Sequence, residues 1–506
     1  MSYLQPDLPP VPKKRSKKRL FLAGLLGVGL TVLTLFAASG TLVSAFSNIK
    51  NTVKFPSQEI GGLLASVGSS LGNVTGGAGT SLSLLGDAQV FLALLPDLLD
   101  GKGGDAFIEQ LHILEEKLIG LSKTGDGASL LSLVGSSDDL RVLGATAGLF
   151  GDWLEDKEER HIAVLFGNTA EMRPGGGFIG SYAEITLEKG ALTDITVRDI
   201  NESDRLLAQD FIPPVPLEPI TDRWRAAEGN WFLDGPTSGA VVLDLMNRSR
   251  LQTNPERKLD GVAMLSAPLV AELLKTTGPI ALNNGIKVTA ENFLTVIQGE
   301  VQEGLARKNE HPKAVLGELT PRLLDKLRVL SRENPTVLLS PLVNGLYSRD
   351  LYLYVADAEL QKQLVSLGIG GALYPLSDTF QGGYVAVAPS TIGADKTDAV
   401  VAQQIVIKEE LTPGGQVETN VSITREHKGN DRSEWWYRED HRSYVKLYAP
   451  LLSEVVRTSG LWKRDRDNAR YDSNFASVID GTTGNDSMGV GYTDAQGDQI
   501  TAGNDY

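Results

Sequence analysis

The sequence predicts a mixed α/β (α+β) domain, preceded by a transmembrane helix and a helical stalk and followed by a small all-β, sandwich-like domain and a disordered tail. Three observations indicate this: an apolar N-terminal run, strands interleaved with helices in the middle, and short alternating strands towards the C-terminus. The expected parts are a basic cytoplasmic segment at 1–19, an anchor at 20–46, a Gly/Ser-rich tether and helical stalk at 47–157, the α/β domain at 158–380, the β-sandwich-like domain at 381–460, and an acidic tail rich in Gly, Asn and Asp at 461–506.

The N-terminal apolar run predicts a membrane anchor. No charged residue lies between Leu20 and Phe46, and about 20 apolar residues of helix span a bilayer core. Six Lys and Arg residues stand just before Leu20, and clustered positive charge stays on the cytoplasmic side. The alternative is a cleaved signal peptide, whose apolar region is shorter, roughly 7–15 residues. We therefore expect a single-pass membrane protein with the bulk of the chain extracytoplasmic.

Cysteine content and charge exclude several kinds of site and partner. The chain has no cysteine, which excludes disulfides, thiolate metal sites and a cysteine nucleophile, and favours a bacterial envelope over a eukaryotic surface. It carries 48 Lys+Arg against 63 Asp+Glu, with six of the basic residues in the first 19 positions. An acidic exterior excludes broad nucleic-acid binding, which needs a basic face.

Helices are expected in the second half of the stalk. After a tether from Ser47 to Leu85, apolar residues recur at spacings of three and four, which is typical of an amphipathic helix. These residues are Phe107, Leu111, Leu114, Leu118 and Leu121. Ser137 followed by two aspartates predicts the capped start of another helix, running to about Phe150.

The α/β domain is predicted from strands and helices that alternate along the chain. The expected strands are Ile162 to Phe166, which is wholly apolar, Tyr182 to Leu187, Ile195 to Val197, and Gly261 to Leu265. The expected helices are Thr237 to Met246, Pro268 to Lys275, Ala290 to Leu305 and Pro321 to Leu330.

The region after Gly382 predicts a β-sandwich. Its alternating runs are Tyr384 to Ala388, Ala399 to Ile407, Gln416 to Thr424 and Tyr444 to Tyr448. The aromatic cluster Trp435, Trp436 and Tyr437 either packs within a hairpin or stacks on sugars. From about Asp467 the composition indicates disorder.

The densest group of unusual residues is a glycine-rich segment that follows the first strand. Gly175, Gly177 and Gly180 satisfy G-x-G-x-x-G, but the motif runs into an alternating strand rather than a helix, which excludes dinucleotide binding. Glycines allow close approach of a ligand and can point amides at an anion, and arginine suits phosphate. We therefore regard Arg173, Arg198 and the neighbouring Asp199 as candidates for a phosphate site. The alternative is that Arg173 pairs with Glu171 structurally and the glycines only form a tight turn.

These residues carry a resemblance. The run from Asn168 to Tyr182 resembles the signature of the bacterial family catalogued as domain of unknown function 4012. Further segments are similar to later landmarks of that family, over roughly 85 to 455. They are Asp260-Gly261-Val262, Thr277-Gly278-Pro279, Lys396-Thr397-Asp398 and Tyr444 to Pro450. The family implies no established activity.

The order of landmarks more distantly resembles the LytR–CpsA–Psr (LCP) family, membrane-anchored enzymes that transfer polyprenyl-pyrophosphate-linked glycans to the cell wall. The resemblance implies an LCP-like core with Arg173, Arg198 and Asp199 as catalytic residues. Implied substrate-binding candidates are Asn168, Glu171, Gly175, Gly176, Gly177, Arg205, Asn230, Arg307, Lys308 and Lys313. The aspartates that hold magnesium in that family are missing, because Asn168 or Thr169 and Gly175 stand in their places. Mg²⁺ therefore lacks its expected ligands, although Glu171 could substitute.

Two functions follow. In the first, the chain is an envelope protein that binds, and could transfer, a polyprenyl-(pyro)phosphate-linked glycan, with the membrane and a cell-wall polymer as its partners. In the second, it is a non-enzymatic surface, adhesion or assembly protein that uses the same fold as a scaffold. Fold analogy alone does not choose between them.

Overall fold

A computed structural model describes residues 78–124, 137–218, 220–252, 258–309, 311–373, 383–393, 396–450 and 453–460, with short strand segments at 475–476, 490–493 and 499–502. The predicted basic segment, the anchor at 20–46 and most of the tether lie outside the described residues. Within the described residues, no helix is long and apolar enough to cross a membrane.

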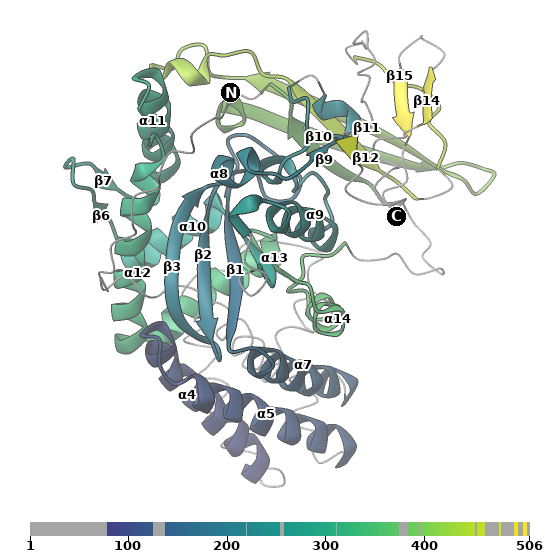
Figure 1. Cartoon of the computed structure of the whole chain (residues 1–506). Helices are drawn as coiled ribbons and strands as arrows, with labels where there is room; N and C mark the ends of the chain where they lie inside the picture. Colours follow the sequence, from purple (N-terminus) through teal and green to yellow (C-terminus); the bar gives the residue numbers. More distant parts are fainter. Residues whose placement is uncertain are drawn as a thin grey trace.

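A five-stranded mixed sheet forms the centre of the molecule (Figure 1). Its strands, in spatial order, are β3 (Ala191–Asp199), β2 (Phe178–Glu188), β1 (Glu159–Asn168), β5 (Gly261–Ser266) and β8 (Leu351–Val355). β1 pairs antiparallel with β2 and parallel with β5, while β2–β3 and β5–β8 are antiparallel. The mixed α/β class is thus confirmed. The four predicted strands are present, and β8 is an additional one.

Both faces of the sheet are covered, which explains why the middle of β1, from Ile162 to Phe166, is apolar. Ile162 and Val164 belong to one core cluster, and Ala163 and Leu165 belong to a second cluster on the opposite face. The first cluster is covered by α10 (Ala267–Thr277), α11 (Phe293–Ala306), α12 (Ala314–Glu333), α13 (Leu339–Ser348) and α14 (Ala358–Ser366). The second is covered by α8 (Ile200–Arg205) and α9 (Gly235–Asn247). Side chains that alternate between two buried faces favour apolar residues at successive positions of this stretch.

Local sequence chemistry sets the ends of the helices. The Asp234 carboxylate accepts a hydrogen bond from the backbone N–H of Thr237 and caps α9, which has proline in its first turn. α10 ends at Gly278, whose φ of 76° suits glycine. α12 begins earlier than predicted, at Ala314, and Pro321 lies inside it.

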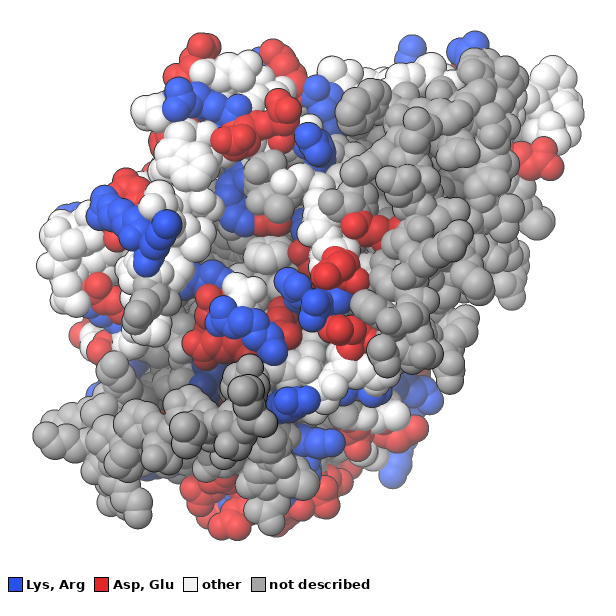
Figure 2. Space-filling model, turned by 45° about the horizontal axis from the view of Figure 1, so that its top comes forward, with Lys and Arg blue, Asp and Glu red and all other residues white. Residues whose placement is uncertain are grey.

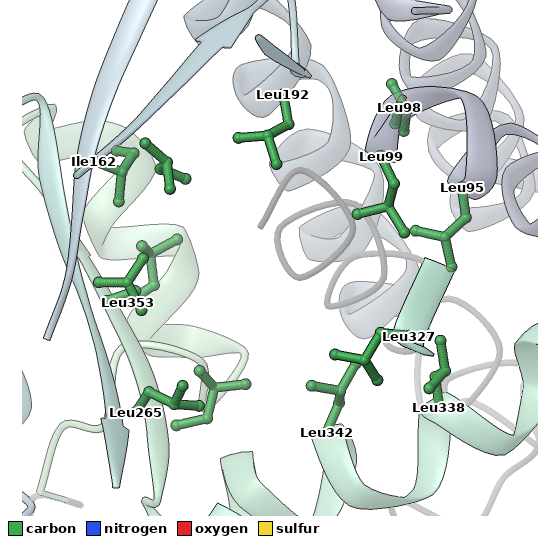
Figure 3. Packing of buried hydrophobic residues seen from close by; sticks show 14 of the residues in the cluster. Leu95, Leu98, Leu99, Ile162, Leu192, Leu265, Leu327, Leu338, Leu342 and Leu353 are labelled. Atoms are coloured by element: carbon green, nitrogen blue, oxygen red, sulfur yellow. The ribbon is translucent and has the colours of Figure 1, made fainter. Parts of the chain in front are cut away.

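The helices expected to form a stalk instead belong to the core. They are α4 (Ala78–Leu99), which already covers the end of the predicted tether, α5 (Gly104–Thr124) and α7 (Ser137–Glu155). The predicted stripe of α5 is confirmed, because all five of its apolar residues are buried. They share one apolar cluster with the sheet and α12, and Figure 3 shows leucines of α4 facing Leu327 and Leu338. An amphipathic helix buries its stripe against the nearest apolar surface, which here is the α/β domain.

Among the described residues after Gly382, the strands do not form the expected β-sandwich. β9 (Ala386–Thr391) pairs with β12 (Ser443–Tyr448), and β10 (Val401–Leu411) pairs with β11 (Val417–His427), as two separate two-stranded ribbons. A sandwich needs two sheets that bury their inner faces on each other. Here β10 and β11 are exposed along most of their length, whereas Tyr444 of β12 stacks on Trp231 of the α/β core at 5.9 Å.

The remaining described elements are short. Strand pairs form between β4 (Asp210–Phe211) and β13 (Phe475–Ala476), β6 (Ile280–Ala281) and β7 (Lys287–Val288), and β14 (Val490–Thr493) and β15 (Gln499–Ala502). The 3₁₀ turns are η1 (Val215–Leu217), η2 (Ala226–Glu228), η3 (Arg250–Gln252), η5 (Pro335–Leu338), η6 (Thr397–Val400) and η7 (Trp435–Tyr437). The tail predicted to be disordered lies mostly outside the described residues.

Integration of the N-terminal helices into the core can be tested at Phe107. This buried ring of α5 packs where a side chain at Gly190, in the β2–β3 turn, would clash. Phe107→Ala should lower the free energy of unfolding by about 3–5 kcal/mol, because it leaves a cavity. Amide exchange in β2 should accelerate together with that in α5. The exposed Glu116→Ala is the control, and unchanged exchange in β2 would instead indicate an independent stalk.

Candidate functional site

The glycine-rich segment forms a tight turn from the end of β1 to the start of β2. Gly176 and Gly177 have φ values of 107° and 98°, which side chains rarely adopt. A Cβ at Gly177 would lie 2.6 Å from the carbonyl oxygen of Asn168, and one at Gly176 would lie 2.9 Å from the Met264 side chain. The glycines are therefore required by the closeness of the turn to its own chain and to β5.

The amides of this turn are already occupied. Gly175 N–H donates to the Asn230 carbonyl at 3.1 Å, and the Gly176 and Gly177 amides donate to the Arg173 carbonyl at 3.2 and 3.0 Å. The fully buried Asn230 side chain in turn donates to the carbonyls of Gly175 and Gly177. The predicted grouping of Asn230 with the three glycines is thus present, but their amides do not form an open anion cradle.

Arg173 is fully buried, and its guanidinium donates to acceptors within the protein. Nε and Nη2 contact the Glu228 carboxylate at 2.8 and 2.7 Å, and Nη2 also lies 3.4 Å from Glu171. Nη1 donates to the backbone carbonyls of Met172 and Thr391 at 2.9 and 2.6 Å. A guanidinium has five N–H donors, and these five contacts use them. In this arrangement Arg173 has no donor left for a phosphate.

Glu171 links this arginine to a lysine far away in the sequence. One carboxylate oxygen faces Arg173, and the other contacts the Lys396 ammonium, which also lies 4.8 Å from the centre of the Phe178 ring. Burial lowers the pKa of Lys396 to about 8. Both oxygens of Glu171 are therefore engaged by cations, so it is not poised to replace a missing magnesium ligand.

Asp398 closes the turn from the C-terminal side. Its carboxylate accepts the Met172 N–H at 2.7 Å and contacts the Thr391 hydroxyl, while its own N–H donates to the Ala170 carbonyl at 3.0 Å. The Thr391 N–H also donates to Met172, at 2.9 Å. β9 and η6 are thereby hydrogen-bonded to the segment that carries Arg173.

A second polar group joins the β10–β11 ribbon to the same aspartate. Arg425 Nη2 lies 2.8 Å from Asp398 Oδ1 and 3.0 Å from His441 Nε2. His441 Nδ1 is 2.8 Å from the hydroxyl of the buried Thr397. Burial is the main cause that lowers the pKa of His441, and the Arg425 charge lowers it further, against the opposing effect of Asp398. This pattern fits a neutral imidazole whose Nε2 accepts from Arg425.

A buried carboxylate, that of Asp204, fixes the turn that carries Glu228. Asp204 accepts the backbone N–H groups of Ala226 and Ala227 at 2.8 and 3.3 Å and so positions the short turn η2 that carries Glu228. Burial raises the pKa of Asp204 to about 6. The aspartate is thus a positioning group for the Arg173 ion pair.

The other predicted cations lie elsewhere. Arg198 pairs with Glu184 at 3.1 Å. Lys313 Nζ donates to Asp199 at 2.7 Å and to the Gly180 carbonyl at 2.6 Å, and Asp199 also caps α8. The structure thus brings Lys313 and Asp199 together, whereas Arg173 and Arg198 have separate partners. The three remaining candidates, all exposed, are Arg205, Lys308 and Arg307, which pairs with Glu303.

Asn168 and the aromatic cluster meet at α11. The Asn168 side-chain oxygen accepts from Gln298, and the Gln298 oxygen accepts from the Tyr437 hydroxyl at 2.6 Å. Trp436 is buried beside Gly299, while Trp435 is 44% exposed. Packing on α11 therefore accounts for two of the three aromatic residues.

The partners that complete this site were not predicted as site residues from the sequence. They are Glu228, Lys396, Asp398, Arg425 and His441. A pattern that could have indicated two of them was the landmark Lys396-Thr397-Asp398, which was noticed without a contact to assign to it. In the described part of the chain, no three His, Asp or Glu residues are placed to hold a metal ion.

Removal of the buried arginine should destabilise the whole site. Arg173→Ala leaves the Glu228 carboxylate without its buried countercharge and leaves Glu171 with Lys396 alone, so we expect the free energy of unfolding to fall by about 3–5 kcal/mol. Urea denaturation measures this. Arg307→Ala removes an exposed pair and should stay near wild type. An Arg173→Ala protein with wild-type stability would contradict the structural role.

The His441 site predicts a dependence of stability on pH. Because the folded-state pKa lies below the unfolded value of about 6.5, the folded protein binds the proton less readily. The contribution is fully present above the unfolded value and is lost as pH falls from there towards the folded pKa. His441→Gln retains an acceptor for Arg425 without titrating, so wild type should lose more stability than the variant between pH 7.5 and 5. Parallel urea-denaturation profiles would refute this assignment.

Comparison with known proteins supplies one match. Residues 157–301 match the family described as "Protein of unknown function (DUF4012)". Neither the curated proteins nor the solved structures contain a match. The matched segment runs from β1 through the glycine turn to α11, and includes Glu171, Arg173 and Glu228. The resemblance noted at the glycine-rich segment is therefore confirmed over residues 157–301, which match the DUF4012 family model.

Proposed function

We propose that this chain is a membrane-anchored, extracytoplasmic envelope protein that acts as a non-enzymatic scaffold, in which the α/β core holds the β10–β11 ribbon out for binding. The anchor rests on the uncharged apolar run at 20–46 and the basic residues before it. The scaffold role rests on the contacts of Arg173 and of the glycine turn in the α/β core. The alternation of acidic and basic side chains on the face shown in Figure 2 agrees with a protein-binding rather than a nucleic-acid-binding role.

The observation that carries the proposal is the saturation of Arg173. Phosphate recognition by arginine needs free donors, and here Glu228, Glu171 and two backbone carbonyls use all five. The amides of the glycine turn are paired as well. The group expected to recognise a phosphate instead connects the core to β9.

A second candidate function is binding of a polyprenyl-(pyro)phosphate-linked glycan. It is favoured by Arg198 and Lys313, which lie by the end of β3 and remain 36% and 19% exposed. Each already has a carboxylate partner, Glu184 and Asp199 respectively. A phosphate at this place has to displace both carboxylates, which weakens the candidate but makes it testable.

Direct binding separates the two functions. We expect the full-length chain in detergent to show no saturable binding of farnesyl pyrophosphate, with or without Mg²⁺, in isothermal titration calorimetry. Incubation with a polyprenyl-pyrophosphate-linked glycan and Mg²⁺ should release no polyprenyl phosphate. Saturable binding that is lost in Arg198→Ala and Lys313→Ala, but kept in Arg307→Ala, would reject the scaffold and support the glycan function.

A further inference from the structure

The β10–β11 ribbon is a long element that little of the described structure covers. Its register runs unbroken from Val401↔His427 to Leu411↔Val417, so eleven residues of each strand make a ribbon about 35 Å long. It extends across the top of the view in Figure 1. Among the described residues, no third strand pairs with either edge. An isolated two-stranded ribbon is only marginally stable, so it gains from an added strand.

The two faces of the ribbon differ in chemistry. One face, the apolar face, carries large apolar side chains that remain exposed by 37% at Ile405, 46% at Ile407, 74% at Leu411 and 45% at Val417. Two polar pairs, Gln403 with Arg425 and Glu409 with Thr419, interrupt it. Val421 and Ile423 lie opposite Ile407 and Ile405 and complete this stripe. The other face is mainly polar and carries Lys408, Glu410, Glu418 and Glu426, with Val406 as its one large apolar residue.

The polar face contains an unfavourable pair of like charges. Glu410 and Glu418 lie directly opposite each other near the end of the ribbon. Like charges in this position destabilise a strand pair, and Lys408 is the cation that follows next on the same face. β11 thus presents an acidic residue, Glu418, on its polar face and the apolar residues Val421 and Ile423 on its other face.

Hydrogen bonds attach the base of the ribbon to the core. Arg425, on the apolar face, contacts Asp398 and Gln403, and Asp398 is tied to the glycine turn. A binding element whose orientation is fixed beforehand loses less entropy when a partner binds. The β10–β11 ribbon is therefore hydrogen-bonded, through Asp398, to the glycine turn of the core.

The edge is better suited to a partner than the apolar face. The Glu409 side chain, which belongs to the apolar face, lies against the backbone of Gly383, and this contact obstructs a flat partner. The strands themselves contain no proline, and their register contains no bulge, which are two of the features that protect an edge from pairing. A single added strand fits these constraints.

We propose that the outer edge of β11 accepts one extended strand from a partner protein, with apolar and basic residues in alternation. Its apolar residues extend the stripe beside Val421 and Ile423, and its basic residues lie on the polar face beside Glu418. A second copy of this chain is disfavoured, because the chain carries a net charge of −15 and would bring acidic ribbon ends together. This inference names the partner of the scaffold and rests on that proposed function.

The test uses the full-length chain in detergent and three capped eight-residue peptides. One alternates Val and Lys, one alternates Val and Glu, and one has the Val-Lys composition in two blocks. We expect the alternating Val-Lys peptide to bind at least tenfold more tightly than either control, and to slow amide exchange in β11. Binding should weaken in 0.5 M NaCl, because the charges involved are exposed.

Two variants on β11 separate the apolar from the electrostatic contribution to peptide binding. Val421→Asp should abolish the binding, and Glu418→Lys should reverse the preference towards the Val-Glu peptide; Lys287→Glu, on the distant β7, is the matched control. If Val421→Asp disturbs the ribbon, the reversal in Glu418→Lys still decides the matter. Equal binding of the block peptide, no binding at all, or self-association of the chain that is lost in Val421→Asp would overturn the inference. Pyrophosphate binding is measured independently, so rejection of the scaffold function is distinguishable from rejection of this partner.

Discussion

The buried ion pair between Arg173 and Glu228 is the interaction on which the arrangement around the sheet depends. Burying these charges costs desolvation energy, which excellent geometry and additional hydrogen bonds have to offset. Glu171 and two backbone carbonyls provide those bonds. The arginine is therefore tolerated only if η2, the glycine turn and β9 are all in place, so it selects one arrangement of three segments from distant parts of the chain.

The same network makes the C-terminal ribbons part of the α/β core. Lys396 and Asp398 bind on either side of the turn, and Asp398 passes the connection to Arg425 at the base of β11. At the opposite end, α4, α5 and α7 bury their apolar stripes in the core they share with the sheet. The described structure is thus continuous from the N-terminal helices to the root of the projecting ribbon.

This continuity bears on function. A transferase of lipid-linked glycans needs cations that can release their internal partners, whereas a scaffold benefits when they do not. Arg173 keeps its internal partners, as a scaffold requires. Arg198 and Lys313 are paired but partly exposed, so their pairs are compatible with either function. A fold can support either use, so the distinction rests on the state of these side chains rather than on topology.

The sequence by itself determined the elements whose cause is local. The apolar run of β1, the α5 stripe, the Asp234 cap and the need for glycine at Gly176 and Gly177 follow from periodicity, capping and backbone geometry. It also identified Asn168 to Tyr182 as the unusual segment. These properties act over a few residues and are legible in the order of the chain.

Only the tertiary structure decided what the unusual segment does. Arg173 meets Glu228 across 55 positions, and Glu171 meets Lys396 across 225. No periodicity encodes such pairs, because they arise when separate elements pack on one sheet. For the same reason the stalk became part of the core and the expected sandwich became two ribbons: apolar stripes and aromatic faces bury against whichever surface the completed fold presents, and burial is non-directional.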